Sequence, residues 1–172
     1  MSKESEAELD HGYLLSILDY DPETGVFTWK IKRRGAQGRG DGNLAGGVHS
    51  VSGYHRIRID GVLFLSHRLA WFYVFGEWPQ VKIDHRNLNR SDNRLCNLRL
   101  ASHSQNQWNQ GVSKRNKSGH KNVAWYKAYG MWQVQVGFKG KTYNGGYFTV
   151  LEDAVASANA LRERLHGEFA MC

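Results

Sequence analysis

Hydrophobic residues near the start of the chain recur at helical spacing and then give way to a turn. The stretch 21–25 has the composition of a turn and leads into the apolar stretch 26–29, for which we predict a strand. The positions at helical spacing, which predict a short N-terminal helix, are Leu9, Tyr13, Leu14, Ile17 and Leu18.

Two predicted strands, 54–59 and 62–65, flank the dipeptide Asp60-Gly61. This arrangement is typical of a β-hairpin with a two-residue loop. Because successive side chains of a strand point to opposite faces, the two isoleucines of the first strand share one face. Arg56 and Arg58 then share the other.

A helical pattern follows this hairpin. We expect Ser66 to cap a helix that ends at Gly76. The apolar positions inside it are Leu69, Ala70, Phe72 and Tyr73. A loop-rich segment, 82–101, then precedes a short polar helix that begins at Ser102.

The last third of the chain contains strand patterns at 122–126, 131–138 and 141–148. The middle pattern alternates, so one face is apolar and the other is polar and basic. The apolar positions are Trp132, Val134, Val136 and Phe138, and the polar ones are Gln133, Gln135, Gly137 and Lys139. Adjoining strands add Trp125, Lys127, Lys141 and Tyr143. An exposed basic and aromatic sheet can enter a major groove. The alternative is an ordinary α+β domain in which the aromatic residues pack.

A helix at about 150–166 follows these strands, with Thr149 and Glu152 as a predicted capping box and Gly167 as its end. Its apolar stripe consists of Ala154, Ala158, Leu161 and Leu165. We expect the apolar face of the sheet to pack on this stripe.

The clearest boundary is a linker of Ser, Lys, Asn and Gly composition at 111–118. It separates an expected domain at 1–110 from one at 119–172. The chain length, 172 residues, suits one domain or two small ones.

Charge favours a polyanionic partner. The chain carries 23 Lys and Arg against 16 Asp and Glu, and residues 30–150 alone have a net charge of +15. Such a field favours nucleic acid. The segment 33–47, with six glycines and three arginines, is either a loop that closes over a phosphate or a solvated surface loop.

Several classes of protein are disfavoured. No apolar run approaches the roughly 20 residues that a membrane span needs, and the acidic start is unlike a signal peptide. We therefore expect a soluble, cytoplasmic protein. Cys96 and Cys172 are too few for a disulfide framework or a thiolate zinc site.

The polar cluster at 84–109 is the candidate chemical site. Asp84 and His85 are adjacent at a predicted strand end, and Ser102 with Gln105 predicts a capping box that places Asn106 at the start of a helix. A carboxylate and an amide oxygen suit Mg²⁺ or Mn²⁺, and His85 suits a general base. The alternative is that these residues simply form turns and caps.

The stretch from Leu65 to Asn109 closely resembles HNH endonucleases, most nearly the phage and homing-type enzymes. The resemblance is carried by residues 66–71, 83–85, 92–94, 97–99 and 104–106. Residues 19–29 are similar to what precedes this motif in phage proteins. The resemblance implies a ββα-metal module. With the small β-rich region before it and the three-stranded sheet and helix that the pattern predicts after it, we expect an α+β fold.

The same resemblance implies the roles of four residues. Asp84 and Asn106 would hold one divalent ion, Mg²⁺ or Mn²⁺ with Zn²⁺ as a further candidate. His85 would be the general base, and Asn97 would brace the loop and help to orient His85. Asn106 stands where the family has its final histidine, a change that the homing branch accepts and that weakens the case for tight zinc binding.

Residues 119–172 look like the Apetala-type (ethylene-response-factor) DNA-binding domain, in which arginines and tryptophans of the sheet contact DNA. The resemblance rests on 118–119, 122–125, 132–134, 140–141, 146–148, 152–154 and 167–170. Trp125 and Trp132 match, whereas the sheet offers Lys and Gln in place of Arg. Because lysine lacks the bidentate fork of arginine, we expect contacts to the backbone more than base readout.

We therefore predict a metal-dependent HNH endonuclease, encoded by a phage or mobile element, that hydrolyses double-stranded DNA in a bacterial host. The predicted DNA-binding residues are Arg56, Arg58, His67, Arg68, Arg86, Trp125, Lys127, Trp132, Gln133, Gln135, Lys139 and Lys141. For His67, packing or helix capping is the alternative. The sequence leaves open monomer or homodimer, nicking or double-strand cleavage, and the target. The alternatives are a DNA-binding regulator with a vestigial nuclease fold and, with less support, an RNA-binding protein.

Overall fold

The described part of the chain forms two compact units. The computed structural model describes residue 6 and residues 8–30, 44–113 and 115–170. The units are Met1–Ala101 and Ser102–Cys172. The segment expected as a linker, 111–118, falls inside the second unit, so the compact units and the sequence-based domains divide the chain at different places. None of the described helices has the length and apolar character that crossing a bilayer would require.

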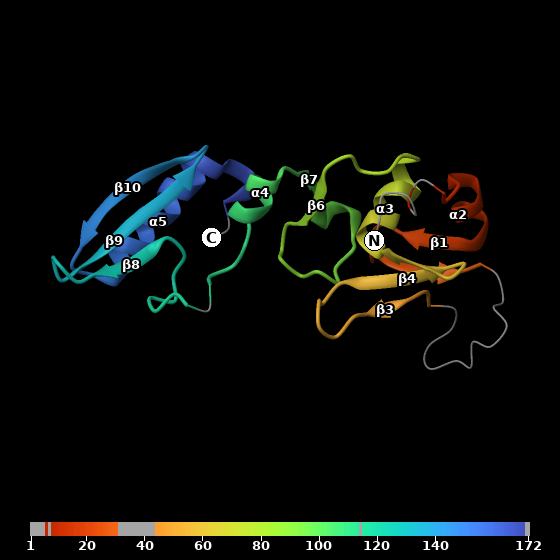
Figure 1. Ribbon diagram of the computed structural model, residues 1–172, viewed down its shortest axis with the longest axis horizontal. Coiled ribbons are helices and arrows are strands. Elements are labelled where there is room, and N and C mark those ends of the chain that lie inside the picture. Colours follow the sequence, from red (N-terminus) through yellow and green to blue (C-terminus); the bar gives the residue numbers. More distant parts are fainter. Residues whose placement is uncertain (1–5, 7, 31–43, 114, 171–172) are drawn as a thin grey trace. The chain divides into compact units, whose positions relative to one another are not determined.

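The first unit mixes short helices with three antiparallel sheets, which pair β1 with β2, β3 and β5 with β4, and β6 with β7. Figure 1 labels most of its elements. In chain order they are α2 (His11–Ile17), β1 (Leu18–Asp21), β2 (Val26–Trp29), β3 (Gly47–Val48), β4 (His55–Ile59), β5 (Val62–Leu65), α3 (Ser66–Phe75), β6 (Lys82–His85), the 3₁₀ helix η1 (Leu95–Asn97) and β7 (Leu98–Ala101).

The predicted N-terminal helix and β-hairpin are both present. Asp10 caps α2 by accepting a hydrogen bond from the Tyr13 amide at 2.8 Å, and the helix ends where Leu18 becomes extended. In the hairpin, Asp60 and Gly61 have φ values of 46° and 84°. Two positive values are what a type I′ turn requires. The arginines of β4 lie on the face of the strand that is opposite to its buried isoleucines, as the alternation predicts.

The predicted capping role of Ser66 is wrong. The N-cap of α3 is Leu65, and Ser66 is the first helical residue. The reason is a competing partner, because the Ser66 hydroxyl lies 2.6 Å from His55 Nδ1 on the neighbouring strand. The predicted end at Gly76 is confirmed, with φ of 72° in the left-handed region.

The second unit is a three-stranded antiparallel sheet in the order β10-β9-β8, covered on one face by a long helix, as Figure 1 shows. Its elements are α4 (His103–Trp108), β8 (Val123–Tyr126), β9 (Met131–Phe138), β10 (Lys141–Phe148), α5 (Leu151–His166) and the 3₁₀ helix η2 (Gly167–Phe169). The mixed fold and the chain order β6, β7, α4 confirm the predicted α+β class and are consistent with a ββα module.

The predicted face of β9 packs as expected. The fully buried core of this unit consists of Val123, Val134, Val136, Ala154, Ala158 and Leu161. The capping box predicted at the start of α5 is wrong. The N-cap is Val150, without a side-chain hydrogen bond, because the helix begins at Leu151, one residue later than that box requires. The predicted capping box of Ser102 and Gln105 at α4 is confirmed.

The prediction of a basic, glycine-rich loop at 33–47 falls mostly outside the described residues. Residues 33–43 of the glycine-rich basic segment lie outside the described residues. The rest of that segment includes Ala45, which is buried in the first core, and its amide donates to the Phe27 carbonyl at 2.8 Å.

The turn between β1 and β2 supports the loop before β7. Gly25 has φ of +74°, and a Cβ atom added there would lie 2.4 Å from the Arg94 amide nitrogen and 2.5 Å from the Asn93 carbonyl carbon. The Leu95 amide donates to the Pro22 carbonyl at 3.0 Å. The glycine therefore permits both the left-handed turn and the close approach of the two backbones.

We predict that Gly25→Ala destabilises the protein more than Gly61→Ala. Both positions have positive φ, so each alanine incurs about 1–2 kcal/mol of backbone strain. Only Gly25 also faces backbone atoms, whereas nothing lies within 4 Å of the Cβ position at Gly61. Urea unfolding of both variants measures the difference. Equal free energies of unfolding would contradict the close approach.

Candidate active site

Asp84 and His85 lie at the end of β6, inside the first unit. The register of β6 with β7 places Asp84 opposite Arg99 and His85 opposite Leu98. Both candidate residues are buried, with 4% and 5% of their surface exposed. The hairpin β6–β7 therefore fixes the backbone of both residues and leaves their orientation to side-chain contacts.

The carboxylate of Asp84 forms a buried ion pair with Arg99. Arg99 Nε and Nη2 lie 2.9 Å and 2.8 Å from Asp84 Oδ2, and both side chains are about 95% buried. A buried charge is strongly destabilising unless it is paired. The ion pair explains how a charged carboxylate is tolerated at this buried position. It also fixes the carboxylate in one orientation.

The surroundings of His85 favour its neutral imidazole. Its ring lies 5.0 Å from that of His67 and 6.0 Å from that of Tyr54. Burial lowers the pKa of His85 below its ordinary value, and the nearby Asn93 side chain and the charge of Asp84 partly oppose this shift. A neutral imidazole is the form that can accept a proton.

Asn97 ties the loop that follows β6. Its Oδ1 accepts a hydrogen bond from the Asn87 amide at 3.0 Å, and its Nδ2 donates to the Asp92 carbonyl at 2.8 Å. The Arg86 amide donates to the Asn97 carbonyl at 2.9 Å. This is the geometry that bracing a loop requires; the catalytic importance of Asn97 stays a prediction.

The sequence reasoning missed Asn93 and Arg99 as site residues. Asn93 is 3% exposed, its Nδ2 donates to Ser91 at 3.2 Å, and its carbonyl accepts from the Tyr20 hydroxyl at 2.7 Å. The available signal for Asn93 was its place in the motif 92–94. For Arg99 the available signal was its position two residues after Asn97. No spacing rule connects that position to Asp84.

His67 is buried rather than presented to solvent. It is 6% exposed, and its ring also lies 5.2 Å from that of Tyr54. Burial, together with the charges of His85 and Arg68, lowers the pKa of His67 to about 3. These contacts favour the packing alternative over the phosphate contact.

Asn106 lies on α4, which belongs to the second unit. It is half-buried, and its amide donates to the Ser102 carbonyl at 3.0 Å. Its meeting with Asp84 around one ion stays a prediction. Across the part of the chain that the structure describes, no three His, Cys, Asp or Glu side chains are grouped so that they could hold a metal.

The four candidate arginines of the first unit differ in their availability to DNA. Arg68 forms a bidentate pair with Glu6, with Nη2 at 2.7 Å from Oε2. Arg56 donates to Ser52 and is half-buried, whereas Arg58 and Arg86 are exposed. Arg58 and Arg86 are thus the better placed for a phosphate.

The tryptophans of the second unit lie on the helix side of the sheet. Trp125 and Trp132 are cross-strand partners with ring centroids 4.9 Å apart. They share a face with Val123 and Val134, which pack on α5. The alternation of β9 predicts Trp132 on this packing face, whereas Trp125 is 49% exposed. A contact of either tryptophan with DNA stays a prediction. The opposite face carries Tyr126 and Tyr147, and the β-bulge after Asn144 places Tyr147 there.

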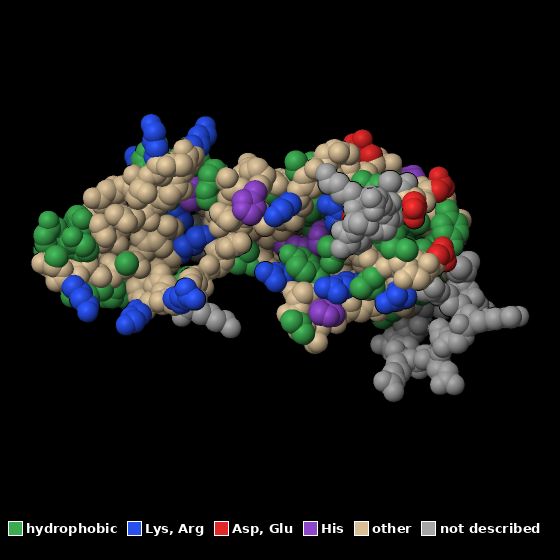
Figure 2. Space-filling model, in the orientation of Figure 1, with side chains coloured by type: hydrophobic (Ala, Val, Ile, Leu, Met, Phe, Trp, Pro, Cys, Tyr) green, Lys and Arg blue, Asp and Glu red, His purple; other side chains and the backbone are tan. Residues whose placement is uncertain are grey.

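A basic groove of about 460 Å³ lies between α4 and the β9–β10 turn. The residues with cationic or titratable side chains in its wall are Lys121, Lys139, Lys141 and His166, and no Asp or Glu contributes. On the face drawn in Figure 2, acidic side chains gather over the first unit and none shows on the second. The groove therefore suits an anionic ligand. Lys127, Gln133 and Gln135 lie outside it, on β9 or at the β8–β9 turn.

The comparisons with known proteins identify part of the chain. A sequence model described as HNH endonuclease matches residues 64–108. Protein 3.8 of Escherichia phage T7 is 38% identical over 105 residues, which are 60% of this chain and 86% of that protein. The chain belongs to the family of phage T7 Protein 3.8. No solved structure matches the chain.

The HNH endonuclease domain runs from Phe64 in β5 to Trp108 at the end of α4. It includes all four residues of the predicted site. The domain implies a nucleic-acid substrate and supports nuclease activity in general. Its matched segment also crosses from the first compact unit into the second.

We predict that Arg99→Met lowers the free energy of unfolding by about 3–5 kcal/mol, because Asp84 is left buried without its cation. Arg94→Met is the matched control. Arg94 pairs with Asp92 at 2.6 Å but is 47% exposed, so about 1 kcal/mol or less is expected. Denaturant unfolding measures both. Similar losses in the two variants would contradict a special role for the buried pair.

Proposed function

We propose that this protein is a metal-dependent DNA endonuclease of the HNH type that hydrolyses phosphodiester bonds. The observation that carries the proposal is that Asp84 and His85 are adjacent at the end of β6, within the matched HNH domain. Arg99 fixes the carboxylate, and Asn93 lies beside the imidazole. A turn-forming loop without chemistry would not need two buried polar residues held in this way.

The donor set fits one hard divalent cation. Asp84 and Asn106 would hold it, and carboxylate and amide oxygens suit Mg²⁺ or Mn²⁺. Because Arg99 offsets the charge of Asp84, the protein alone supplies little negative charge, which favours a site completed by a substrate phosphate. When bound, the ion would stabilise the charge that develops on the phosphate and on the leaving oxygen.

His85 would act as the general base. Its neutral imidazole accepts a proton from water, and the water oxygen attacks phosphorus as the bond to the 3′ oxygen breaks. The products are a 3′ hydroxyl, which takes up a proton, and a 5′ phosphate. Asn97 keeps the loop beside His85 in place by bridging Asn87 and Asp92. One such site cuts one strand, so a monomer would nick.

The second unit would bind the backbone of double-stranded DNA. Two features support this: the basic groove with Lys139 and Lys141 in its wall, and the resemblance of residues 119–172 to Apetala-type domains. Lysines are point charges that contact phosphates without reading bases. The groove would therefore position DNA more than select a sequence.

A second candidate is a DNA-binding protein without catalysis. The observation that favours it is the burial of Asp84 and His85, at 4% and 5% exposed. Cleavage requires water and phosphate to reach these side chains, whereas binding through the groove does not.

We predict that His85→Ala lowers the rate of plasmid nicking with Mg²⁺ or Mn²⁺ at least about a hundredfold, which is the contribution of a general base. Duplex binding should change little. His49→Ala is the control, because His49 is exposed outside the proposed site. Divalent-ion-dependent nicking by wild-type protein, abolished by a chelator, is required. Wild-type rates in His85→Ala would favour the second candidate.

We predict that the double variant Lys139→Met, Lys141→Met binds duplex DNA more weakly and with a shallower salt dependence. Each lost phosphate contact should reduce the slope of log K against log salt by about 0.9. Lys117→Met, a lysine that is exposed outside the groove, is the control. An unchanged slope, measured by fluorescence anisotropy between low and moderate salt, would exclude the groove as the DNA contact.

A further inference from the structure

The helix α4 cannot be held in place by its own sequence. It has six residues, and Trp108 is its one apolar side chain. Isolated helices shorter than about 12 residues are marginal in water. The capping box of Ser102 and Gln105 orders its first turn, and Trp108 and the C-terminal carbonyls make further contacts at its other end.

Trp108 packs on the second unit. Its ring stacks on that of His166 at 4.6 Å with an interplanar angle of 1°, and it lies 5.2 Å from the ring of Phe138. His166 Nε2 lies 2.9 Å from the Gly137 carbonyl oxygen, which fixes the imidazole between α5 and β9. The helix also lies against η2. Trp108 is thus anchored to the layer formed by the sheet and α5.

Lys121 holds the other end of α4. Its ammonium group donates to the carbonyls of Trp108 and Gln110, each at 2.5 Å. The last carbonyls of a helix have no partner within the helix, and Lys121 supplies one for the carbonyl of Trp108. Burial and the nearby charge of Arg162 lower the pKa of Lys121 to about 8. The side chain of Lys121 is half-buried where it makes these two hydrogen bonds.

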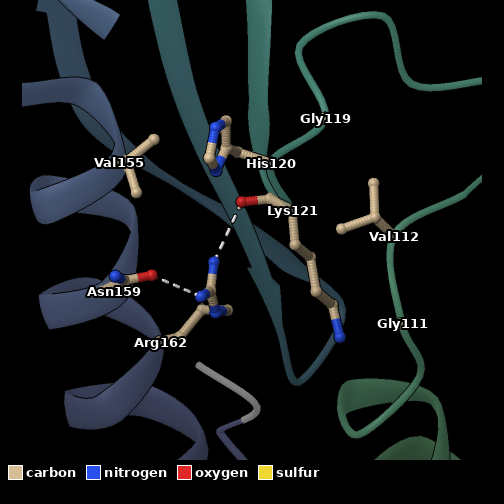
Figure 3. A pocket seen from close by; sticks show the side chains of 8 residues that line it. All are labelled: Gly111, Val112, Gly119, His120, Lys121, Val155, Asn159 and Arg162. Atoms are coloured by element: carbon tan, nitrogen blue, oxygen red, sulfur yellow. Dashed lines mark hydrogen bonds between the residues drawn. The ribbon is translucent and has the colours of Figure 1, made fainter. Parts of the chain in front are cut away.

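Lys121 is itself tied to α5. Figure 3 shows Arg162 reaching the main-chain oxygen of Lys121 and the side chain of Asn159. The first of these bonds is 2.9 Å long, and Arg162 is 3% exposed. A chain of contacts thus runs from the buried face of α5 through Lys121 to the end of α4.

We propose that the second unit is a platform that positions α4, with Trp108, Lys121 and His166 as positioning residues for Asn106. The inference rests on the proposed function, in which Asn106 is a metal ligand. It deepens that function, because the second unit then does more than bind DNA. The nuclease site would be complete only when α4 is docked on the sheet and α5.

The platform also links DNA binding to the site. Trp108 and Lys121 belong to the wall of the groove that contains Lys139 and Lys141. A DNA backbone held in that groove would touch the side chains that hold α4. Substrate binding and the placement of Asn106 would therefore favour each other.

The test uses full-length protein with Trp108→Ala and Lys121→Met, the conservative variants Trp108→Phe and Lys121→Arg, and Lys117→Met as control. Hydrogen exchange measures protection of residues 103–110. Nicking is measured at saturating DNA, so that changes in affinity do not enter the rate, across a Mg²⁺ titration. Exchange in β9 reports whether the unit itself remains folded.

In Trp108→Ala and Lys121→Met, we expect exchange in α4 to accelerate at least tenfold while β9 is unchanged. The nicking rate should fall at least tenfold, and half-maximal rate should need more Mg²⁺. The conservative variants should stay within threefold of wild type in rate. Wild-type rates despite faster exchange in α4, or unchanged exchange, would overturn the inference. A wild-type protein that does not nick overturns the proposed function, and this inference with it.

Discussion

The buried ion pair between Asp84 and Arg99 is the interaction on which the candidate site depends. Two charges that lie about 95% out of solvent are tolerable only as partners, and the antiparallel register of β6 and β7 makes them direct neighbours. The pair fixes the carboxylate and also reduces its net charge. A site with so little charge of its own would bind a cation weakly until a phosphate arrives, which ties metal binding to substrate binding.

The same burial sets the state of His85. An imidazole removed from water favours its neutral form, and the nearby Asn93 side chain only partly opposes this. Asn93 is placed by Tyr20, whose hydroxyl donates to its carbonyl, and by the close approach of Gly25 to its backbone. The β1–β2 hairpin, which is remote in sequence from His85, therefore supports the candidate base indirectly, through Asn93. The small sheet of β1 and β2 thus packs against the loop that contains Asn93.

Local patterns in the sequence predicted most helices and strands, but not the contacts between residues that are distant in sequence. The Asp60-Gly61 hairpin and the capping box of Ser102 follow from a few adjacent residues, and both are present. The capping role of Ser66 failed because His55, eleven residues earlier, competes for its hydroxyl. The position of Tyr147 on the polar face of the last sheet depends on the β-bulge after Asn144, which the strand pattern at 141–148 does not predict.

The site shows the same division. Asp84 and His85 could be singled out because a motif names them, whereas the partner of Asp84 depends on strand register. Arg99 and Asn93 stand in the motifs 97–99 and 92–94, but those motifs do not say which side chains these two residues contact. Sequence therefore identifies the groups that do chemistry more readily than the groups that hold them.

The boundary between the compact units explains why a small polar helix matters. The HNH match ends at Trp108, yet the contacts of Trp108 lie in the layer of β9 and α5. A segment of one sequence family is therefore stabilised by residues that follow it in the chain. The cap of this six-residue helix orders its start, and Trp108 and Lys121 connect its end to the second unit. The unit that would bind DNA is thus also the unit on which the last element of the nuclease motif depends.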